Sequence, residues 1–119
     1  MFKAGLLKGK RILVTGGGTG LGREIAAKYL ELGAELWLCG RRGAVLESTA
    51  KELVAARGGV VRTHSVDIRE AAAVDAMVQR IWDESGPLTG LVNNAAGNFI
   101  SPTKDLTPNG FNAIANTVF

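Results

Sequence analysis

Short apolar runs alternate with segments of helical periodicity, and this alternation constrains the fold more than any other feature of the sequence. The runs RILVT and ELWLC are rich in β-branched and aliphatic residues and end at glycines, which is typical of buried strands. From Leu21 to Leu32, apolar residues recur at helical spacing, and Gly33 follows as a natural stop. We predict strands at residues 11–15, 35–39, 60–66 and 90–94, helices at residues 21–32, 44–57 and 71–84, and a further helix from Asn109 onward.

This order predicts an α/β fold with a parallel sheet, because crossovers of this length bring successive strands into the same direction with helices on both faces. Right-handed crossovers then give a Rossmann-like, doubly wound sheet in the order 3-2-1-4, in three α/β/α layers. The third strand lies nearer the sheet edge, since Arg62 and His64 alternate with apolar neighbours. A chain of 119 residues supports one core, so we expect a single domain.

Composition excludes several other classes of protein. The 14 Lys and Arg residues outnumber the 11 Asp and Glu residues without forming a basic run, which argues against nucleic-acid and membrane-surface partners. No apolar stretch reaches the ~20 residues of a membrane span. The single cysteine, Cys39, excludes an internal disulfide and a zinc site built from several thiolates. We therefore expect no metal site and a cytoplasmic location.

The first predicted strand runs into the glycine-rich stretch TGGGTGLG and then into a helix. Glycines at such a junction let the backbone approach a pyrophosphate, while free N–H groups and the helix dipole offset its charge. Glycine turns also simply end strands, but the surrounding βαβ unit favours a dinucleotide site. A Walker A loop fits poorly, because Arg23 and Glu24 stand where Lys and Ser or Thr are needed. The candidate residues of this loop are Gly16, Gly17, Gly18, Thr19, Gly20 and Leu21.

Two arginines, Arg41 and Arg42, follow the second predicted strand. A site that prefers NAD has a carboxylate here for the ribose hydroxyls, whereas guanidinium groups suit the 2′-phosphate of NADP(H). The sequence therefore favours NADPH. The alternative is that both arginines only solvate the strand end and cap the next helix.

Polar residues also follow the third and fourth predicted strands. Asp67 could accept a hydrogen bond from the adenine amino group with Ile68 beside the ring, or it could cap the following helix. Asn93 and Asn94 end the fourth strand, at the edge where open α/β sheets bind ligands. Their amides need partners, and we expect them to hold backbone groups of the neighbouring strand and loop.

Together, TGGGTGLG, VDIR and LVNNAAGN resemble the N-terminal half of a short-chain dehydrogenase/reductase, and the match covers nearly the whole chain. The stretch NNAAGNFISPTKDLTPNGF is similar to the corresponding part of 2,4-dienoyl-CoA reductases, the NADPH-dependent members that act on unsaturated fatty acyl-CoA. The doubled alanine, Ala95 and Ala96, and the following Asn98 and Phe99 distinguish this subgroup.

The resemblance implies roles for individual residues. The glycine loop would hold the pyrophosphate, Arg41 the adenosine phosphate, and Asp67 and Ile68 the adenine. Asn98 would polarise the thioester-conjugated region as the catalytic residue. The remaining implied contacts are Ala95 and Gly97 with the cofactor, and Arg69, Phe99 and Thr107 with the acyl-CoA. Phe99 could equally close over the core as a loop aromatic, and Arg69 could be an exposed residue at a helix start.

The family's catalytic tyrosine and lysine follow a fifth strand, which the resemblance places after Phe119. The one tyrosine, Tyr29, falls on the apolar side of a predicted helix and is expected to be a packing residue. We therefore expect residues 1–119 to be a truncated NAD(P)-binding domain that is inactive alone and whose intact form is a homo-oligomer. The alternatives are a carbonyl or alcohol dehydrogenase and a catalytically silent nucleotide-binding module.

Overall fold

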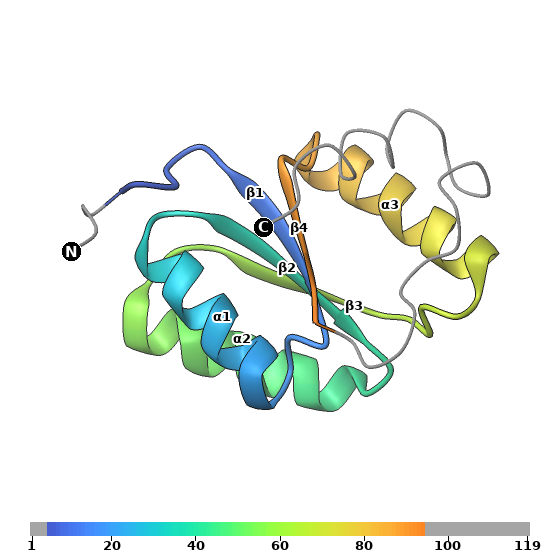
Figure 1. Ribbon diagram of the computed structural model, residues 1–119, viewed down its shortest axis with the longest axis horizontal. Helices are drawn as coiled ribbons and strands as arrows, with labels where there is room; N and C mark the ends of the chain where they lie inside the picture. The colour runs from blue at the N-terminus through green and yellow to red at the C-terminus, as the bar shows by residue number, and fades with distance from the viewer. Residues whose placement is uncertain (1–4, 95–119) are drawn as a thin grey trace.

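The computed structural model describes residues 5–94, which form a four-stranded parallel sheet in the order β3-β2-β1-β4 (Figure 1). The strands are β1 (Arg11–Thr15), β2 (Glu35–Gly40), β3 (Val61–Ser65) and β4 (Gly90–Asn93), and the helices are α1 (Gly20–Glu31), α2 (Gly43–Arg57) and α3 (Ala71–Ser85). The predicted α/β fold and strand order are confirmed, and each predicted boundary lies within one residue of the observed one. The helix predicted from Asn109 lies outside the described residues.

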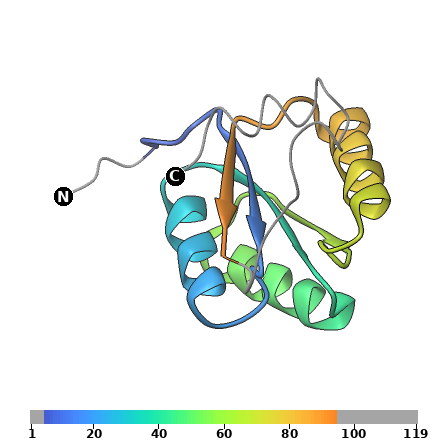
Figure 2. The same ribbon diagram turned by 45° about the vertical axis from the view of Figure 1, so that its right-hand side comes forward.

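The sheet is sandwiched between α1 and α2 on one face and α3 on the other (Figure 2). Successive side chains of a strand point to opposite faces, so the run RILVT contributes side chains to the cores on both faces of the sheet. Ile12 and Val14 pack towards α1 and α2, whereas Leu13 packs towards α3. Both faces of β1 are thus buried, which explains why its central residues, Ile12 to Val14, are all apolar rather than alternating with polar ones.

Trp37 anchors the layer between β2 and α3. Its side chain is fully buried, and its indole N–H donates to Ser85 Oγ at 3.0 Å. The Arg80 guanidinium of α3 lies 5.1 Å from the centre of the Trp37 ring. The helix contributes a continuous apolar stripe to the same core, made of Val74, Met77, Val78 and Ile81.

Within residues 5–94, β3 lies at one edge of the sheet, as its sequence predicts. Arg62 and Ser65 are exposed and His64 is half-buried, so this strand carries little of the core. The guanidinium of Arg80 reaches across from α3 to the Thr63 carbonyl oxygen at 3.3 Å and to His64 Nδ1 at 3.0 Å. Charged and polar side chains therefore surround this edge strand, which protects it from pairing with other chains.

Arg11 fastens the amino ends of three strands to one another. Its guanidinium forms an ion pair with Glu35 at 3.2 Å and donates to the Pro87 carbonyl oxygen at 2.8 Å. Its backbone N–H donates to Thr89 Oγ1 at 2.7 Å. These contacts join the start of β1 to the start of β2 and to the segment that enters β4.

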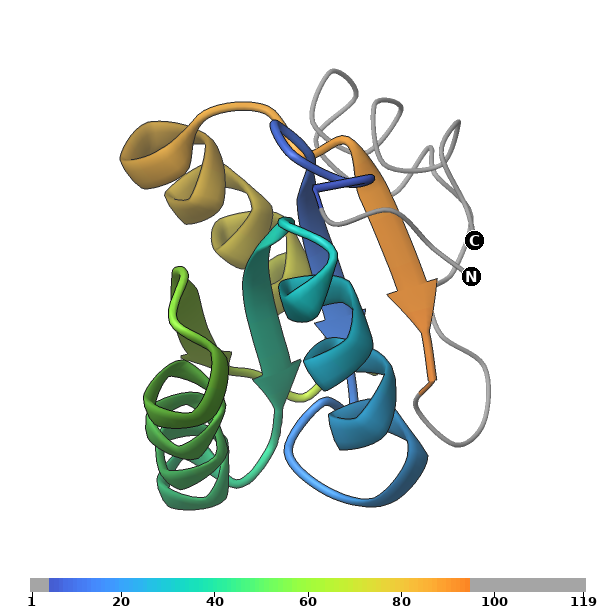
Figure 3. The ribbon, with the colours of Figure 1, turned by 90° about the vertical axis from the view of Figure 1, so that its left-hand side faces the viewer.

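The carboxyl ends of the strands meet at the opposite edge, because the strands run in one direction. Figure 3 shows the arrowheads of β1, β2 and β4 pointing the same way. The glycine stretch after β1, the arginines after β2 and the asparagines at the end of β4 consequently come together at this edge. It is the edge at which open α/β sheets bind ligands.

Candidate functional site

The glycine stretch forms a loop that leaves β1 and enters α1. Gly16 N–H donates to the Cys39 carbonyl oxygen at 2.9 Å, which extends the pairing of β1 with β2 by one residue. Gly16 then adopts a φ of +64° and Gly20 a φ of +55°, conformations that residues with a side chain rarely take. The chain thereby turns sharply enough to begin α1 directly beside the strand it has left.

A close approach between α1 and the loop depends on Gly22. A Cβ at this position would lie 2.0 Å from the Gly16 carbonyl oxygen and 2.6 Å from Asn94 Nδ2. The glycine is therefore required by packing rather than by backbone conformation. The candidate loop residues predicted from the sequence end at Leu21 and do not include Gly22, although Gly22 belongs to the recognised motif TGGGTGLG.

The two asparagines at the end of β4 tie that strand to β1 and the loop: the Asn94 side chain holds a backbone group, as expected, whereas the Asn93 side chain meets the side chain of Thr15. Asn94 donates its backbone N–H to Thr15 Oγ1 at 2.9 Å and its side-chain amide to the Gly16 carbonyl oxygen at 3.5 Å. Asn93 Oδ1 lies 3.2 Å from Thr15 Oγ1. Thr15 is fully buried, so these hydrogen bonds satisfy polar groups that cannot reach water.

Thr49 of α2 also holds the loop, and the sequence analysis did not identify it. Its hydroxyl, on a side chain that is almost fully buried, donates to the Gly18 carbonyl oxygen at 2.6 Å. The signal was present in the sequence, since Thr49 lies three residues after Leu46 and four before Leu53, on the face of the helix that is buried. A polar residue on such a face requires a partner.

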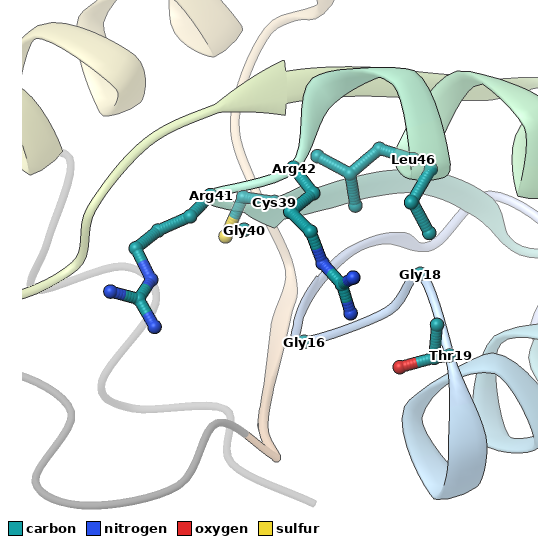
Figure 4. A pocket seen from close by; sticks show the side chains of 9 residues that line it. Gly16, Gly18, Thr19, Cys39, Gly40, Arg41, Arg42 and Leu46 are labelled. Carbon is teal, nitrogen blue, oxygen red and sulfur yellow. The ribbon is translucent and has the colours of Figure 1, made fainter.

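A pocket of about 500 Å³ opens between the loop and the end of β2 (Figure 4). The side chain of Arg42 extends towards the loop between Gly16 and Thr19, whereas that of Arg41 extends away from the loop. The Thr19 hydroxyl points into the pocket. The pocket is lined by Gly16, Gly18, Thr19, Cys39, Gly40, Arg41, Arg42, Val45 and Leu46.

Neither arginine acts as a side-chain cap of α2. Arg42 is the N-cap residue of this helix, but its side chain makes no capping hydrogen bond. Arg41 and Arg42 are both exposed. Two guanidinium groups thus remain available beside the pocket, where they can bind a doubly charged anion such as a phosphate monoester.

A second pocket of about 320 Å³ adjoins the first. Its own lining residues come from the segment after β3, and they include the predicted Asp67 and Ile68. The two pockets share Gly16, Cys39, Gly40 and Arg41, so they form one continuous trough along the carboxyl edge of the sheet.

Asp67 is bound to Arg69 in this second pocket. Its carboxylate accepts hydrogen bonds from Arg69 Nε at 3.0 Å, Arg69 Nη2 at 2.9 Å and the Arg69 backbone N–H at 3.0 Å. The Arg69 guanidinium lowers the pKa of Asp67 from 3.8 to about 2, with Arg41 making a smaller contribution. Asp67 does not cap α3, whose N-cap residue is Glu70. The carboxylate is thus fully ionised at neutral pH.

Two further residues are packing residues. Cys39 lines both pockets, but burial raises the pKa of its thiol to about 12, so it is not a nucleophile at neutral pH. Tyr29 is half-buried against the core between the sheet, α1 and α2, which agrees with the role predicted for it.

Other expectations concern residues outside the described range or features tested only within it. Ala95, Gly97, Asn98, Phe99 and Thr107 lie outside residues 5–94. Among the described residues, no cluster of three or more His, Cys, Asp or Glu side chains has the arrangement of a metal site. None of the helices in the same part of the chain combines the length and apolarity needed to span a bilayer.

The trough fits a dinucleotide by its chemistry and its shape. The glycine loop offers main-chain N–H groups at the start of α1, where a helix N-terminus attracts anions. Because Gly22 has no side chain, α1 can pack closely against the loop. A carboxylate beside Ile68 and two guanidinium groups also line the trough.

Comparisons with known proteins agree with this interpretation. The family model described as short chain dehydrogenase matches residues 10–119. The chain is 41% identical over 119 residues to a probable 2,4-dienoyl-CoA reductase 3 of Caenorhabditis elegans, an alignment covering 99% of this chain and 38% of that protein. It is 39% identical over 109 residues to a probable 2,4-dienoyl-CoA reductase of Bacillus subtilis, covering 92% of this chain and 42% of that protein. The chain thus spans about two fifths of the length of these curated relatives.

Solved structures of similar proteins share the fold. The citronellol catabolism dehydrogenase of Pseudomonas aeruginosa is 43% identical with a TM-score of 0.78, covering 98% of this chain and 47% of that one. The L-sorbose reductase of Gluconobacter frateurii, solved with NADPH and L-sorbose, is 27% identical with a TM-score of 0.74, covering 90% of this chain and 41% of that one. The family match over most of the chain, together with a glycine loop packed against α1 at the carboxyl edge of the sheet, shows that the chain belongs to the short-chain dehydrogenase family.

Proposed function

We propose that the chain is the NADPH-binding part of a short-chain reductase that acts on a 2,4-dienoyl-CoA thioester. The observation that carries the cofactor assignment is the pair Arg41 and Arg42 beside the first pocket, at a strand end with no carboxylate. The L-sorbose reductase, which has the same fold, was solved with NADPH, and this supports the choice. The substrate class rests on the named relatives and on the sequence from Asn93 to Phe111.

Each part of the trough binds a different part of the cofactor. The loop from Gly16 to Leu21 holds the diphosphate, and the two guanidinium groups bind the 2′-phosphate. Asp67 and Ile68 bind the adenine in the second pocket. Asn94 keeps the loop closed against β4 through the Gly16 carbonyl oxygen. Bound NADPH supplies the hydride for reduction of the conjugated double bond.

The remaining roles fall on residues after Asn94. Asn98 polarises the thioester carbonyl, and Phe99 and Thr107 contact the acyl-CoA. The resemblance assigns Arg69 to the acyl-CoA. Its bidentate ion pair with Asp67 instead favours a role in orienting the Asp67 carboxylate at the adenine. Tyr29 packs against the core, so it is not a candidate for the proton donor of the reaction.

Titration with NADPH and NADH tests the cofactor assignment. The protein is expected to bind NADPH more tightly, and Arg41→Ala is expected to weaken NADPH much more than NADH. Arg62→Ala is the matched control, because Arg62 is exposed on β3 and lines neither pocket. Equal weakening of both cofactors by Arg41→Ala would contradict the phosphate role.

The substrate is tested with the enzyme expressed from its full reading frame. We expect NADPH oxidation with a 2,4-dienoyl-CoA and none with simple ketones. Turnover of ketones alone would replace the proposal with a carbonyl reductase. Cofactor binding without turnover of either substrate would indicate a catalytically silent nucleotide-binding protein.

A further inference from the structure

Thr49 of α2 contacts the glycine loop from the interior of the protein. Its side chain is 3% exposed and does not line either pocket. The hydroxyl donates to the Gly18 carbonyl oxygen at 2.6 Å, a short contact between residues 31 positions apart. The carbonyl of Gly18 is therefore directed towards Thr49, which lies outside the lining of both pockets.

The orientation of this carbonyl determines the orientation of the next backbone N–H. In a trans peptide the C=O and N–H bonds point in opposite directions. The N–H of Thr19 consequently points away from Thr49, and both residues of this peptide, Gly18 and Thr19, line the first pocket. Within residues 5–94 this N–H has no hydrogen-bond acceptor. Thr19 is also the N-cap residue of α1, where the helix dipole favours an anion.

A second observation shows why this peptide needs to be held. Three glycines in succession, Gly16 to Gly18, leave the main chain with many accessible conformations, and fixing them is entropically unfavourable. The Gly16 carbonyl oxygen is held by Asn94, and Gly22 leaves room for it. Thr49 holds the Gly18 carbonyl oxygen in the same way, at the other end of the three glycines.

We propose that Thr49 is a positioning residue that fixes the Gly18–Thr19 peptide so that the Thr19 N–H is presented to the diphosphate of the bound dinucleotide. This inference rests on the proposed function. It assigns to Thr49 an effect on the diphosphate, which the loop binds, whereas the 2′-phosphate is assigned to the guanidinium groups of Arg41 and Arg42 in the same pocket. Without the Thr49 hydroxyl, the Gly18–Thr19 peptide can flip. The Gly18 carbonyl oxygen then faces the phosphate, and the Thr19 N–H no longer does.

Two ligands separate a positioning role from a general role in stability. NADPH contains both the diphosphate and the 2′-phosphate, whereas adenosine 2′-monophosphate contains only the latter. We expect Thr49→Val to weaken NADPH by about tenfold, the loss that follows from weakening one charge-assisted hydrogen bond. Binding of adenosine 2′-monophosphate is expected to change by less than about twofold. Both affinities are measured by calorimetric titration.

Three further variants complete the experiment. Thr49→Ser keeps the donor and is expected to restore NADPH binding to within about threefold of the unmodified protein. Ser48→Ala removes a hydroxyl from the exposed side of the same helix and is expected to change neither affinity. If Thr49→Val is too unstable to titrate, Thr49→Cys, with a side chain of similar size and a much weaker donor, takes its place.

The outcomes distinguish this inference from the function on which it rests. Equal weakening of both ligands by Thr49→Val, no weakening of NADPH, or failure of Thr49→Ser to restore binding would overturn the positioning role while leaving the NADPH site intact. Absence of NADPH binding by the unmodified protein would overturn the proposed function and the positioning role together.

Discussion

Substituting Gly22 by alanine tests the packing on which the glycine loop depends. The added Cβ would lie 2.0 Å from the Gly16 carbonyl oxygen, at least 1.0 Å closer than the 3.0 Å below which real Cβ contacts essentially do not occur. This carbonyl is a main-chain group, which cannot rotate away as a flexible side chain can. Displacing the Gly16 carbonyl also breaks its hydrogen bond with Asn94.

The magnitude follows from three contributions. Overpacking at a rigid site costs about 1–3 kcal/mol, and loss of the hydrogen bond with Asn94 costs about 1 kcal/mol. The higher helix propensity of alanine returns at most about 1 kcal/mol. We therefore expect Gly22→Ala to lower the free energy of unfolding by about 3 kcal/mol, since the backbone has no room to yield.

Gly20→Ala is the matched control on the same loop. Gly20 has a φ of +55° and nothing within 4 Å of the added Cβ, so the substitution costs only the conformational strain of about 1–2 kcal/mol. Urea denaturation followed by circular dichroism measures both variants. If Gly22→Ala were no more destabilising than Gly20→Ala, the close contact between α1 and the loop would be refuted as the reason for glycine at this position.

Three further predictions concern single groups. The buried Cys39 thiol, with its pKa raised to about 12, should resist thiol reagents at pH 8 until the protein is unfolded, and rapid labelling of the native protein would contradict its burial. Arg69 lowers the pKa of Asp67 from 3.8 to about 2, so the stability from this ionised carboxylate is present above about pH 4 and is lost as the pH falls towards 2. Arg69→Ala should raise the pKa of Asp67 towards 3.8, as an NMR titration of the carboxyl carbon would detect, and an unchanged pKa would contradict the ion pair. Ser85→Ala removes the acceptor of the buried Trp37 N–H and should lower the free energy of unfolding by about 1–3 kcal/mol, measured in urea, whereas unchanged stability would contradict this hydrogen bond.

The fold could be predicted because it depends on properties visible over short stretches of sequence. The middle of the strand RILVT is apolar, since Ile12 and Leu13 are buried on opposite faces of the sheet. Crossovers of this length predict parallel strands, and the order 3-2-1-4 is the simplest doubly wound arrangement with right-handed connections. Arg62 marked β3 as an edge strand, because an exposed charge is tolerated there more easily than in the middle of a sheet.

The contacts that shape the site could not be read from the sequence in the same way. Thr49 lies 31 residues from Gly18, and nothing local to either residue specifies that they meet. The motif around Gly22 was visible, but its closeness to the Gly16 carbonyl depends on how α1 returns to the sheet. Asp67 and Arg69 are separated by one residue, yet a pairing at this spacing requires a turn whose geometry the sequence leaves open.

The contacts of Arg11 lie at the opposite edge of the sheet from the exposed arginines of the trough, so substitutions at the two places have different consequences. Its ion pair with Glu35 and its hydrogen bonds with Pro87 and Thr89 join the strands at the amino edge, far from the trough. Arg41 and Arg42 are exposed and make no contact in that network, so substitutions at these two positions are expected to leave the folding of the chain largely unchanged. Variation can therefore accumulate at these surface positions, whereas a substitution of Arg11 would loosen three strands at once.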